Sequence, residues 1–275
     1  MAHVDQEGNE VDRHQIHVRR RLNHVRMAPI DVNPAQIDLN PAQIDVDRRL
    51  FDVKIWQKHL LERQNDLVSP PEYDDLMKAL HLRDFFGWSS FDEARNLDFN
   101  SVAWIRAGGN ILFDPLPLTP HDEQHLASLG GASLIVVTNA EHLRGAPSIA
   151  ARFGATIIGP SAERDRGLPY DGFVSDGEII VPGLRVFTMD GSKTPGELAL
   201  LIEDTTLITG DLIRAHQAGY LTLLPDARLV DRTRAVASVR RLASLPGIEA
   251  VLVGDGWPIF RHGGEALREL ADRLG

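Results

Sequence analysis

Residues 136–146, VVTNAEHLRGA, place charged and polar side chains at the point where an apolar run ends. Glu141, His142 and Arg144 stand together there, and side chains of these types bind metal ions, move protons or stabilise negative charge. The apolar run is typical of a buried strand, and ligands of α/β proteins usually bind in loops just beyond the C-terminal ends of strands. This stretch therefore predicts a functional loop, with or without a metal ion.

Three other strand ends in the sequence carry polar groups. Lys193 follows the run RVFTM, Asp211 follows TLIT, and Asp255 follows AVLV. Clustered acids and bases perturb one another's pKa values, and such clusters are enriched at functional sites. We therefore expect the four loops to converge on one cleft that binds a small molecule.

The elements that must position these loops alternate between strands and helices. Runs such as SLIVVT and IEAVLV are apolar at every position, which indicates strands that are covered on both faces. Between the strands, the patterns of HDEQHLASLG, HLRGAPSIAARFG, DRTRAVASVRRLASL and GEALRELADRL indicate helices. The combination predicts a layered α/β domain over residues 98–275.

The sequence before residue 98 differs in composition. Residues 1–50 predict a flexible polar tail, in which a seven-residue repeat carries isoleucine at 30, 37 and 44 and a proline that argues against a coiled coil. Residues 51–97 predict a helical extension that packs on the main domain, because Ser69 and Glu72 form a capping box ahead of an apolar stripe. The isoleucines of the repeat suggest a homo-oligomer as one way to cover them.

Composition excludes several classes of protein. The net charge of −10 disfavours binding to nucleic acid or to an anionic membrane surface. The absence of cysteine excludes disulfides, thiolate metal sites and cysteine nucleophiles. No signal peptide or run of roughly 18 apolar residues is present, so we expect a cytoplasmic protein. A phosphate-binding loop and a serine nucleophile elbow are also missing.

The order and spacing of four stretches resemble the metallo-β-lactamase superfamily, from about residue 100 to the C-terminus. The stretches are NILFDPLPL, VVTNAEHLRGA, GSKTPGELALLIEDTTLITGDLI and VLVGDGW. The resemblance implies an αββα four-layer sandwich with metal-binding loops at one edge. It also implies hydrolysis by a water molecule at one or two metal ions, on a substrate that the fold alone does not fix.

Most of the family's metal ligands are replaced in this sequence. Asn139 and Glu141 stand for the first two histidines of the H-x-H-x-D-H motif, Leu143 and Arg144 for its aspartate and last histidine, Lys193 for the turn histidine, and Asp255 for the final histidine. Asp211 alone is retained. Structural and catalytic zinc sites favour histidine and cysteine ligands, so the resemblance implies a degenerate site that is not an ordinary dinuclear zinc centre.

Three interpretations of this charged cluster remain open. In the first, Lys193 and Arg144 neutralise the carboxylates and the pocket needs no metal ion. In the second, the cluster holds one divalent cation (Mg²⁺, Mn²⁺, Fe²⁺ or Zn²⁺) through oxygen-rich ligation. Its candidate ligands are then Asp211, Asp255, Glu141 and His142. In the third, the polar residues only cap the ends of strands.

For a catalytic pocket, the sequence suggests a division of roles. The candidate general bases toward a water molecule are His142, Asp211 and Asp255. Lys193 and Arg144 are expected to stabilise negative charge on the substrate, with Glu141 in the same cluster.

Three further residues, Asn139, His216 and Trp257, are expected to line the substrate side of the cleft. The function predicted is a hydrolase-like protein that acts on a small molecule through this degenerate site. The alternative is a non-catalytic protein that binds a ligand or a partner protein through the same cleft.

Overall fold

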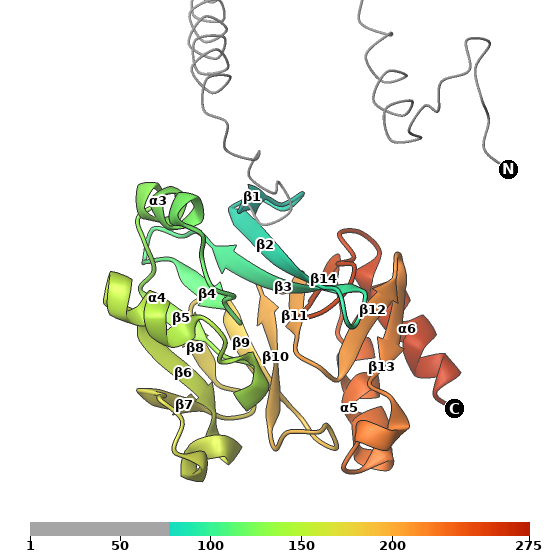
Figure 1. The fold of residues 1–275 in the computed structure, drawn as a ribbon. Helices are drawn as coiled ribbons and strands as arrows, with labels where there is room; N and C mark the ends of the chain where they lie inside the picture. Colours follow the sequence, from blue (N-terminus) through green and yellow to red (C-terminus); the bar gives the residue numbers. More distant parts are fainter. Residues whose placement is uncertain (1–76) are drawn as a thin grey trace, which may run out of the picture. The chain divides into compact units, whose positions relative to one another are not determined.

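The first of two facing sheets contains seven strands (Figure 1). The computed structural model describes residues 77–275. The strands run in the order β1 (Lys78–Ala79), β2 (Phe85–Asp92), β3 (Leu97–Trp104), β4 (Ile111–Phe113), β5 (Leu134–Val136), β6 (Thr156–Pro160) and β7 (Gly172–Val174). Strands β1 to β4 pair in antiparallel fashion, and β4 to β7 pair in parallel.

The second sheet has five strands, with a separate hairpin beside it. Its order is β14 (Ala250–Val253), β11 (Thr206–Thr209), β10 (Glu197–Ile202), β9 (Leu184–Met189) and β8 (Ile179–Val181). Strands β11 and β14 are parallel neighbours. The hairpin consists of β12 (Ile213–Gln217) and β13 (Tyr220–Leu223), and an isolated bridge from Ala215 to Gly256 joins it to the loop after β14.

Helices cover the outer face of each sheet. Their bounds are α3 (Pro120–Ser128) and α4 (Ala146–Phe153) on the first sheet, and α5 (Arg232–Ala243) and α6 (Gly263–Arg273) on the second. Within residues 77–275, three short 3₁₀ helices join the strands, namely η3 (Ala140–His142), η4 (Ser161–Arg166) and η5 (Asp226–Arg228). In the part of the chain that the structure describes, no helix is long and apolar enough to cross a membrane.

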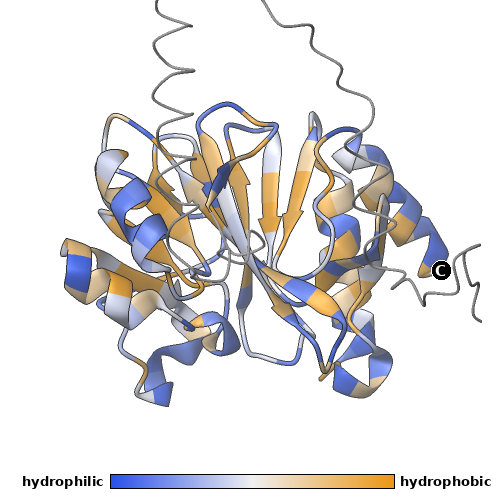
Figure 2. Ribbon diagram, turned by 45° about the horizontal axis from the view of Figure 1, so that its top comes forward, coloured by the Kyte–Doolittle hydropathy of each residue, from blue (hydrophilic) through white to orange (hydrophobic). Residues whose placement is uncertain are grey.

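Strand β10 shows why the sheets are stacked in this way. All six residues of ELALLI are buried, so the strand has an apolar partner on each face. Because side chains alternate along a strand, Leu198, Leu200 and Ile202 pack between the two sheets, whereas Ala199 and Leu201 face α5 and α6. Figure 2 shows the same pattern, with apolar strands inside and polar outer faces on the helices. The αββα four-layer sandwich expected from the sequence is confirmed.

The expected start of this domain at residue 98 is wrong. Strand β2 precedes that boundary and pairs with β3 over eight residues, from Phe85 opposite Trp104 to Asp92 opposite Leu97. Trp88 of β2 is buried and donates a hydrogen bond from Nε1 to the Leu116 carbonyl oxygen at 3.3 Å. The aromatic run FFGWSSF favours a strand, and the sequence interpretation extended the preceding helical pattern over it.

The sandwich therefore includes residues 77–97, which the sequence assigned to a helical extension. The polar tail of residues 1–50, its seven-residue repeat and the capping box at Ser69 lie outside the described residues. They stay predictions.

Candidate active site

The loops that the sequence singled out meet at one edge of the sandwich. Strands β4 and β5 are parallel in the first sheet, and β11 and β14 are parallel in the second, so each pair ends at a common edge. Salt bridges connect Glu141 and Asp211 to Lys193, and Arg214 connects Asp211 to Asp255. The expected convergence of four separate loops is therefore present.

Asp211 is the centre of this cluster. Its Oδ2 atom accepts hydrogen bonds from Asn139 Nδ2 at 3.0 Å and lies 3.1 Å from Lys193 Nζ and 3.4 Å from His142 Nε2. Burial acts to raise the pKa of Asp211, but hydrogen bonds and charges from His142 and Lys193 outweigh it and hold that pKa below its ordinary value. Asp211 is therefore a carboxylate that several cations share.

His142 is buried between two aspartates. Its Nδ1 lies 2.7 Å from Asp114 Oδ2, on the side opposite Asp211. Burial acts to lower the pKa of His142, but the charge and hydrogen bond of Asp114, with a contribution from Asp211, raise it to about 9. The ring is therefore an imidazolium at neutral pH. Because Nδ1 faces Asp114 and Nε2 faces Asp211, this placement fits an ion pair. The general-base role that the sequence suggested stays a prediction.

A second group of charges surrounds Asp255. The Arg214 guanidinium contacts Asp255 Oδ2 through Nη2, and this atom lies 3.8 Å from Asp211 Oδ1. His216 Nε2 lies 3.2 Å from Asp255 Oδ2. Arg214 and His216 are alternate residues of β12, so both side chains lie on the face of the strand that is turned toward Asp255.

Two polar atoms in this second group have no hydrogen-bond partner among the described residues, although both are buried. They are Asp255 Oδ1 and Arg214 Nε. Buried polar atoms without a partner are uncommon and usually mark a place for an ordered water molecule or a ligand. The Asp255 group can therefore bind another polar molecule.

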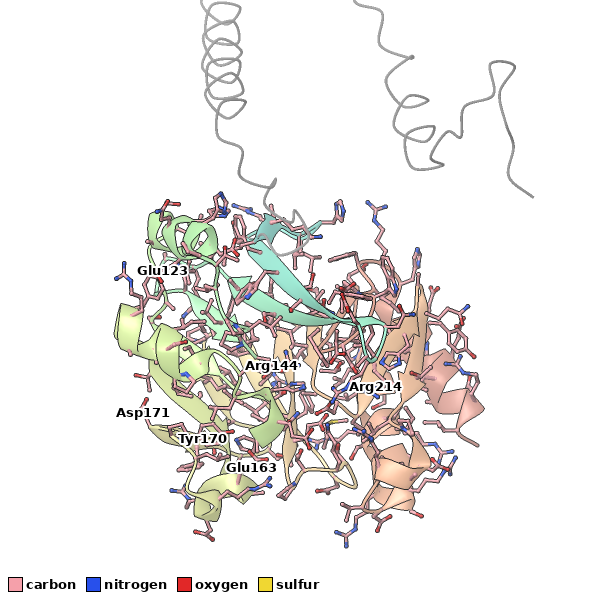
Figure 3. All side chains as sticks on the ribbon, in the orientation of Figure 1. Glu123, Arg144, Glu163, Tyr170, Asp171 and Arg214 are labelled. Atoms are coloured by element: carbon pink, nitrogen blue, oxygen red, sulfur yellow. The ribbon has the colours of Figure 1, made fainter. Side chains whose placement is uncertain are left out.

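The Arg144 side chain lies against the main chain and an aromatic ring, and its expected role in stabilising negative charge on a substrate stays a prediction. Its guanidinium donates to the main-chain oxygen of Asn100 at 3.0 Å and lies over the Phe99 ring, with 5.1 Å from Cζ to the ring centre. Burial lowers the pKa of Arg144, and the carboxylates of the cluster oppose this shift. Arg214 of β12 is the arginine that contacts Asp211 and Asp255. Both arginines are labelled in Figure 3.

Glu197 is a buried acid that the sequence interpretation missed. Its Oε1 accepts from the Leu212 main-chain N–H at 2.7 Å and its Oε2 from the Ser192 hydroxyl at 2.5 Å. Burial and the nearby charge of Asp211 raise the pKa of Glu197 to about 7. The residue therefore ties the Lys193 loop to the Asp211 loop from inside the sandwich.

The segment 139–142 is fixed from two sides. Asn139 caps η3, with its Oδ1 accepting from the Glu141 main-chain N–H at 3.0 Å. The fully buried Glu163 of η4 accepts from the Ala140 main-chain N–H at 3.0 Å and from the Tyr170 hydroxyl at 3.2 Å (Figure 3). This double support holds the loop backbone in place and leaves the Glu141 side chain free to turn.

Trp257 lies apart from the salt bridges. It is 59% exposed and lines an apolar cavity of about 340 Å³ together with Trp88, Leu252 and Phe260. Asn100 and Gly256 also border this cavity, whereas Lys193, Asp211 and His142 do not. The expected apolar wall is present, but it belongs to a neighbouring hollow and not to the charged cluster itself.

The side chains expected to hold a metal ion are already in contact with cations. Glu141 and Asp211 contact Lys193, and Asp255 contacts Arg214. Both ring nitrogens of His142 face carboxylates, with Nδ1 2.7 Å from Asp114 Oδ2 and Nε2 3.4 Å from Asp211 Oδ2. Across residues 77–275, no group of three or more histidine, aspartate or glutamate side chains is arranged to hold an ion. A divalent cation bound there would lie beside several positively charged side chains.

Sequence reasoning missed Asp114 and Arg214 as well as Glu197. Asp114 belongs to the stretch NILFDPLPL and directly follows the end of β4, much as Asp211 comes shortly after the end of β11. The position of Asp114 at a strand end was therefore a usable signal. Arg214 gave no such signal, because the strand β12 that presents it was not expected.

The chain is similar in sequence and structure to known proteins. Residues 77–274 match the model of a family described as the metallo-beta-lactamase superfamily. The hydroxyacylglutathione hydrolase of Brucella anthropi is 32% identical over 120 residues, which cover 42% of this chain and 43% of that protein. The match thus spans less than half the length of this curated relative.

Solved structures share the fold at low sequence identity. The metallo-beta-lactamase from Pontibacter korlensis has a TM-score of 0.57 at 16% identity, over 72% of this chain and 97% of that one. A metallo-beta-lactamase from Erythrobacter litoralis gives 0.55 at 16% identity, over 74% and 97% of the two chains. Members of the family usually bind divalent metal ions, typically zinc. With the family model covering residues 77–274, the chain belongs to the metallo-beta-lactamase superfamily of hydrolases.

Proposed function

We propose that this protein hydrolyses a small molecule without a dinuclear zinc centre, using fixed side-chain cations in the cleft. The observation that carries the proposal is the position of Lys193 and Arg214 between Glu141, Asp211 and Asp255. In this family, metal ions stabilise negative charge that develops on the substrate. A lysine and an arginine held in place by buried carboxylates can supply the same electrostatic stabilisation without reorganising.

His216 is the proposed general base. Its side chain is 39% exposed, which leaves it accessible to water and substrate, and Asp255 lies within hydrogen-bond distance of Nε2. If Nε2 carries the proton that Asp255 accepts, Nδ1 is left as an acceptor. His142 offers no such free nitrogen.

The reaction then follows a general-base course. A water molecule gives a proton to His216 Nδ1 while its oxygen bonds to the acyl carbon of the substrate. The oxyanion that forms is stabilised by Lys193 and Arg214. Collapse of this intermediate breaks the bond to the leaving group, which takes the proton from His216. The products are a carboxylic acid and the protonated leaving group, and the base is regenerated.

The substrate class we propose is an acyl ester or thioester of a small hydroxy acid. The name of the Brucella anthropi relative describes hydrolysis of a hydroxyacylglutathione, and the 32% identity over 120 residues supports testing this compound class. The apolar cavity bordered by Trp257 could hold an apolar part of the substrate or of the leaving group.

One observation favours the alternative of a non-catalytic binding protein. The charged side chains of the cluster largely satisfy one another, as in the pairs of His142 with Asp114 and of Lys193 with Asp211. Buried charges are normally paired in any folded protein, so a network in which the charges pair with one another is not by itself a sign of catalysis. Turnover measurements separate the two functions.

The test is a hydrolysis assay of the full chain on an S-hydroxyacylglutathione and on simple aryl esters, with and without EDTA. We expect turnover that EDTA does not reduce, and about 100-fold lower kcat in Lys193→Ala and His216→Gln. His262→Gln is the matched control, because His262 also lies on the surface beside a carboxylate, that of Glu265, but stands at the start of α6, outside the cluster. Loss of activity with EDTA would overturn the metal-independent mechanism, and no turnover on any substrate would favour the binding protein.

A further inference from the structure

Lys193 has two carboxylate partners that differ sharply in burial. The Asp211 side chain is 6% exposed and lies 3.1 Å from Lys193 Nζ. The Glu141 side chain contacts the same ammonium group from the outside and is 56% exposed. The Lys193 side chain itself is 13% exposed, so Glu141 stands between this cation and solvent.

The free energy needed to separate Lys193 from its partner should therefore differ between the two ion pairs. An exposed pair contributes little to stability, because water and salt compete with it and ordering two side chains costs entropy. A buried pair such as Lys193 with Asp211 cannot separate without leaving an uncompensated charge. Glu141 is thus the partner that can leave.

The backbone around Glu141 does not have to move for this to happen. Its main-chain N–H donates to Asn139 Oδ1 at 3.0 Å, and the neighbouring Ala140 N–H donates to the buried Glu163 at 3.0 Å. Departure of the carboxylate from Lys193 then requires only a change of side-chain rotamer. This separates a fixed loop from a displaceable side chain.

We propose that Lys193 Nζ is the binding point for the carboxylate of the acid product, whose oxygen takes the place of the reaction oxyanion, and that the Glu141 carboxylate occupies this point until the ligand displaces it. Charge balance supports this exchange. With Glu141 turned away, Lys193 is left with Asp211 alone, which His142 and Arg214 also approach. An incoming carboxylate replaces the single negative charge that Lys193 loses when Glu141 turns away. The inference rests on the proposed function in that it assigns the ligand class of the same cleft.

The test measures binding and not turnover. Sodium acetate is titrated into the full ¹⁵N-labelled chain at constant ionic strength, with chloride as the balancing ion, and amide shifts of residues 139–142 and 192–194 are followed. We expect saturable binding, about two- to fivefold tighter in Glu141→Gln, because the variant keeps the shape of the side chain and removes the competing charge. Lys193→Met should show no saturable shift in these amides.

Glu123→Gln is the matched control. The Glu123 side chain is 41% exposed, comparable with Glu141, and pairs with Arg152 on the outer helices, so its loss should leave acetate binding as in wild type. Equal or weaker binding by Glu141→Gln, or saturable binding retained in Lys193→Met, would overturn the proposal. Since Glu141→Gln changes an exposed side chain, its folding is secure even where Lys193→Met is unstable. Failure to hydrolyse any substrate would count against the proposed function alone, because acetate binding is read without turnover.

Discussion

Asp114 and His142 form the most buried ion pair of the cluster, and their chemistry sets the charge of the whole site. The His142 side chain is 5% exposed and that of Asp114 4%. Thr138 donates to both oxygens of Asp114, at 2.7 Å from the main-chain N–H and 2.6 Å from the hydroxyl. A carboxylate fixed in this way holds the imidazolium in a defined orientation toward Asp211.

Removal of the Asp114 charge should destabilise the fold strongly. Asp114→Asn keeps the shape of the side chain and leaves His142 with an incomplete partner set, which typically costs about 3–5 kcal/mol for a buried pair. The free energy of unfolding in urea measures this change. Asp176→Asn is the control, because Asp176 also accepts a main-chain hydrogen bond and pairs with an arginine but is about half exposed. We expect it to cost less than about 1 kcal/mol, and equal losses in the two variants would contradict the burial argument.

Stability should also fall at alkaline pH. The pKa of His142 is raised from 6.5 to about 9 in the folded state. A group whose pKa is raised on folding contributes stability that is fully present below its unfolded pKa and is lost as the pH rises through its folded pKa. Between pH 6.5 and 9 the free energy of unfolding should therefore decrease, by a contribution on the order of 3 kcal/mol.

Two measurements check this prediction. Urea unfolding at pH 6.5, 7.5 and 9 gives the slope, and the NMR shift of the His142 ring proton gives the midpoint directly. A titration midpoint near 6.5 would show that His142 is an ordinary neutral histidine, and the ion-pair account of the site would then be wrong.

At the scale of residues, the sequence predicted which side chains meet but not all of their roles. Glu141, Lys193 and Asp211 could be placed together because each follows a strand of a recognisable motif. Arg144 lies near enough to Asp211 and Asp255 for their charges to act on its pKa, but its guanidinium donates to the Asn100 main-chain oxygen. The direction of a long side chain depends on the backbone dihedral angles of its residue. Arg144 has a φ of +35°, and the spacing of residues along the sequence does not reveal such an angle.

At the scale of elements, the contact of hairpin β12–β13 with the loop after β14 decides where Arg214 and His216 lie. Gly256 has a φ of +89°, and a Cβ atom there would lie 2.1 Å from the Ala215 carbonyl oxygen. The Trp257 N–H donates to that same oxygen at 2.7 Å. Only glycine fits this close approach without moving the hairpin.

Gly256→Ala should therefore separate Asp255 from Arg214 and His216. We expect a loss of unfolding free energy of at least about 2 kcal/mol, from the clash together with the unfavourable φ. Gly177→Ala isolates the second cause, because Gly177 has a φ of +79° and nothing within 4 Å of its added Cβ. Its cost should stay near 1 kcal/mol. Thermal unfolding of both variants measures the difference, and similar losses would mean that the hairpin yields easily.

Strand and helix identities were predicted well wherever an element could be recognised from its own pattern. The apolar runs that form β5 and β14 predicted buried strands, and the pattern of DRTRAVASVRRLASL predicted the helix α5. Strands β2 and β12 were missed. Each pairs with the strand that follows it in the sequence, β2 with β3 and β12 with β13. The aromatic run of β2 was assigned to the preceding helical pattern, and β12 is short, with only two apolar residues, Ile213 and Ala215.

At the scale of the whole molecule, the sandwich has the architecture of its family, whereas the chemistry that we propose at its edge differs from metal-dependent hydrolysis. The core between the sheets includes Phe113, Leu200 and Leu252. None of these side chains is a member of the charged cluster. Fold and site can therefore diverge independently, since burial of apolar surface fixes the layers and loop residues fix the chemistry. This separation explains why the fold was predictable from a few motifs, whereas the reaction was not.

The central claim is that side-chain cations, and not zinc ions, compensate Glu141, Asp211 and Asp255. Elemental analysis of the full chain tests this directly. The protein is purified without chelator, dialysed against buffer with excess zinc and then exchanged into metal-free buffer before the metal content is measured. The account predicts well under one metal ion per chain, with no rise in the unfolding temperature on adding zinc. Retention of one or two zinc ions per chain, with a matching increase in thermal stability, would contradict it.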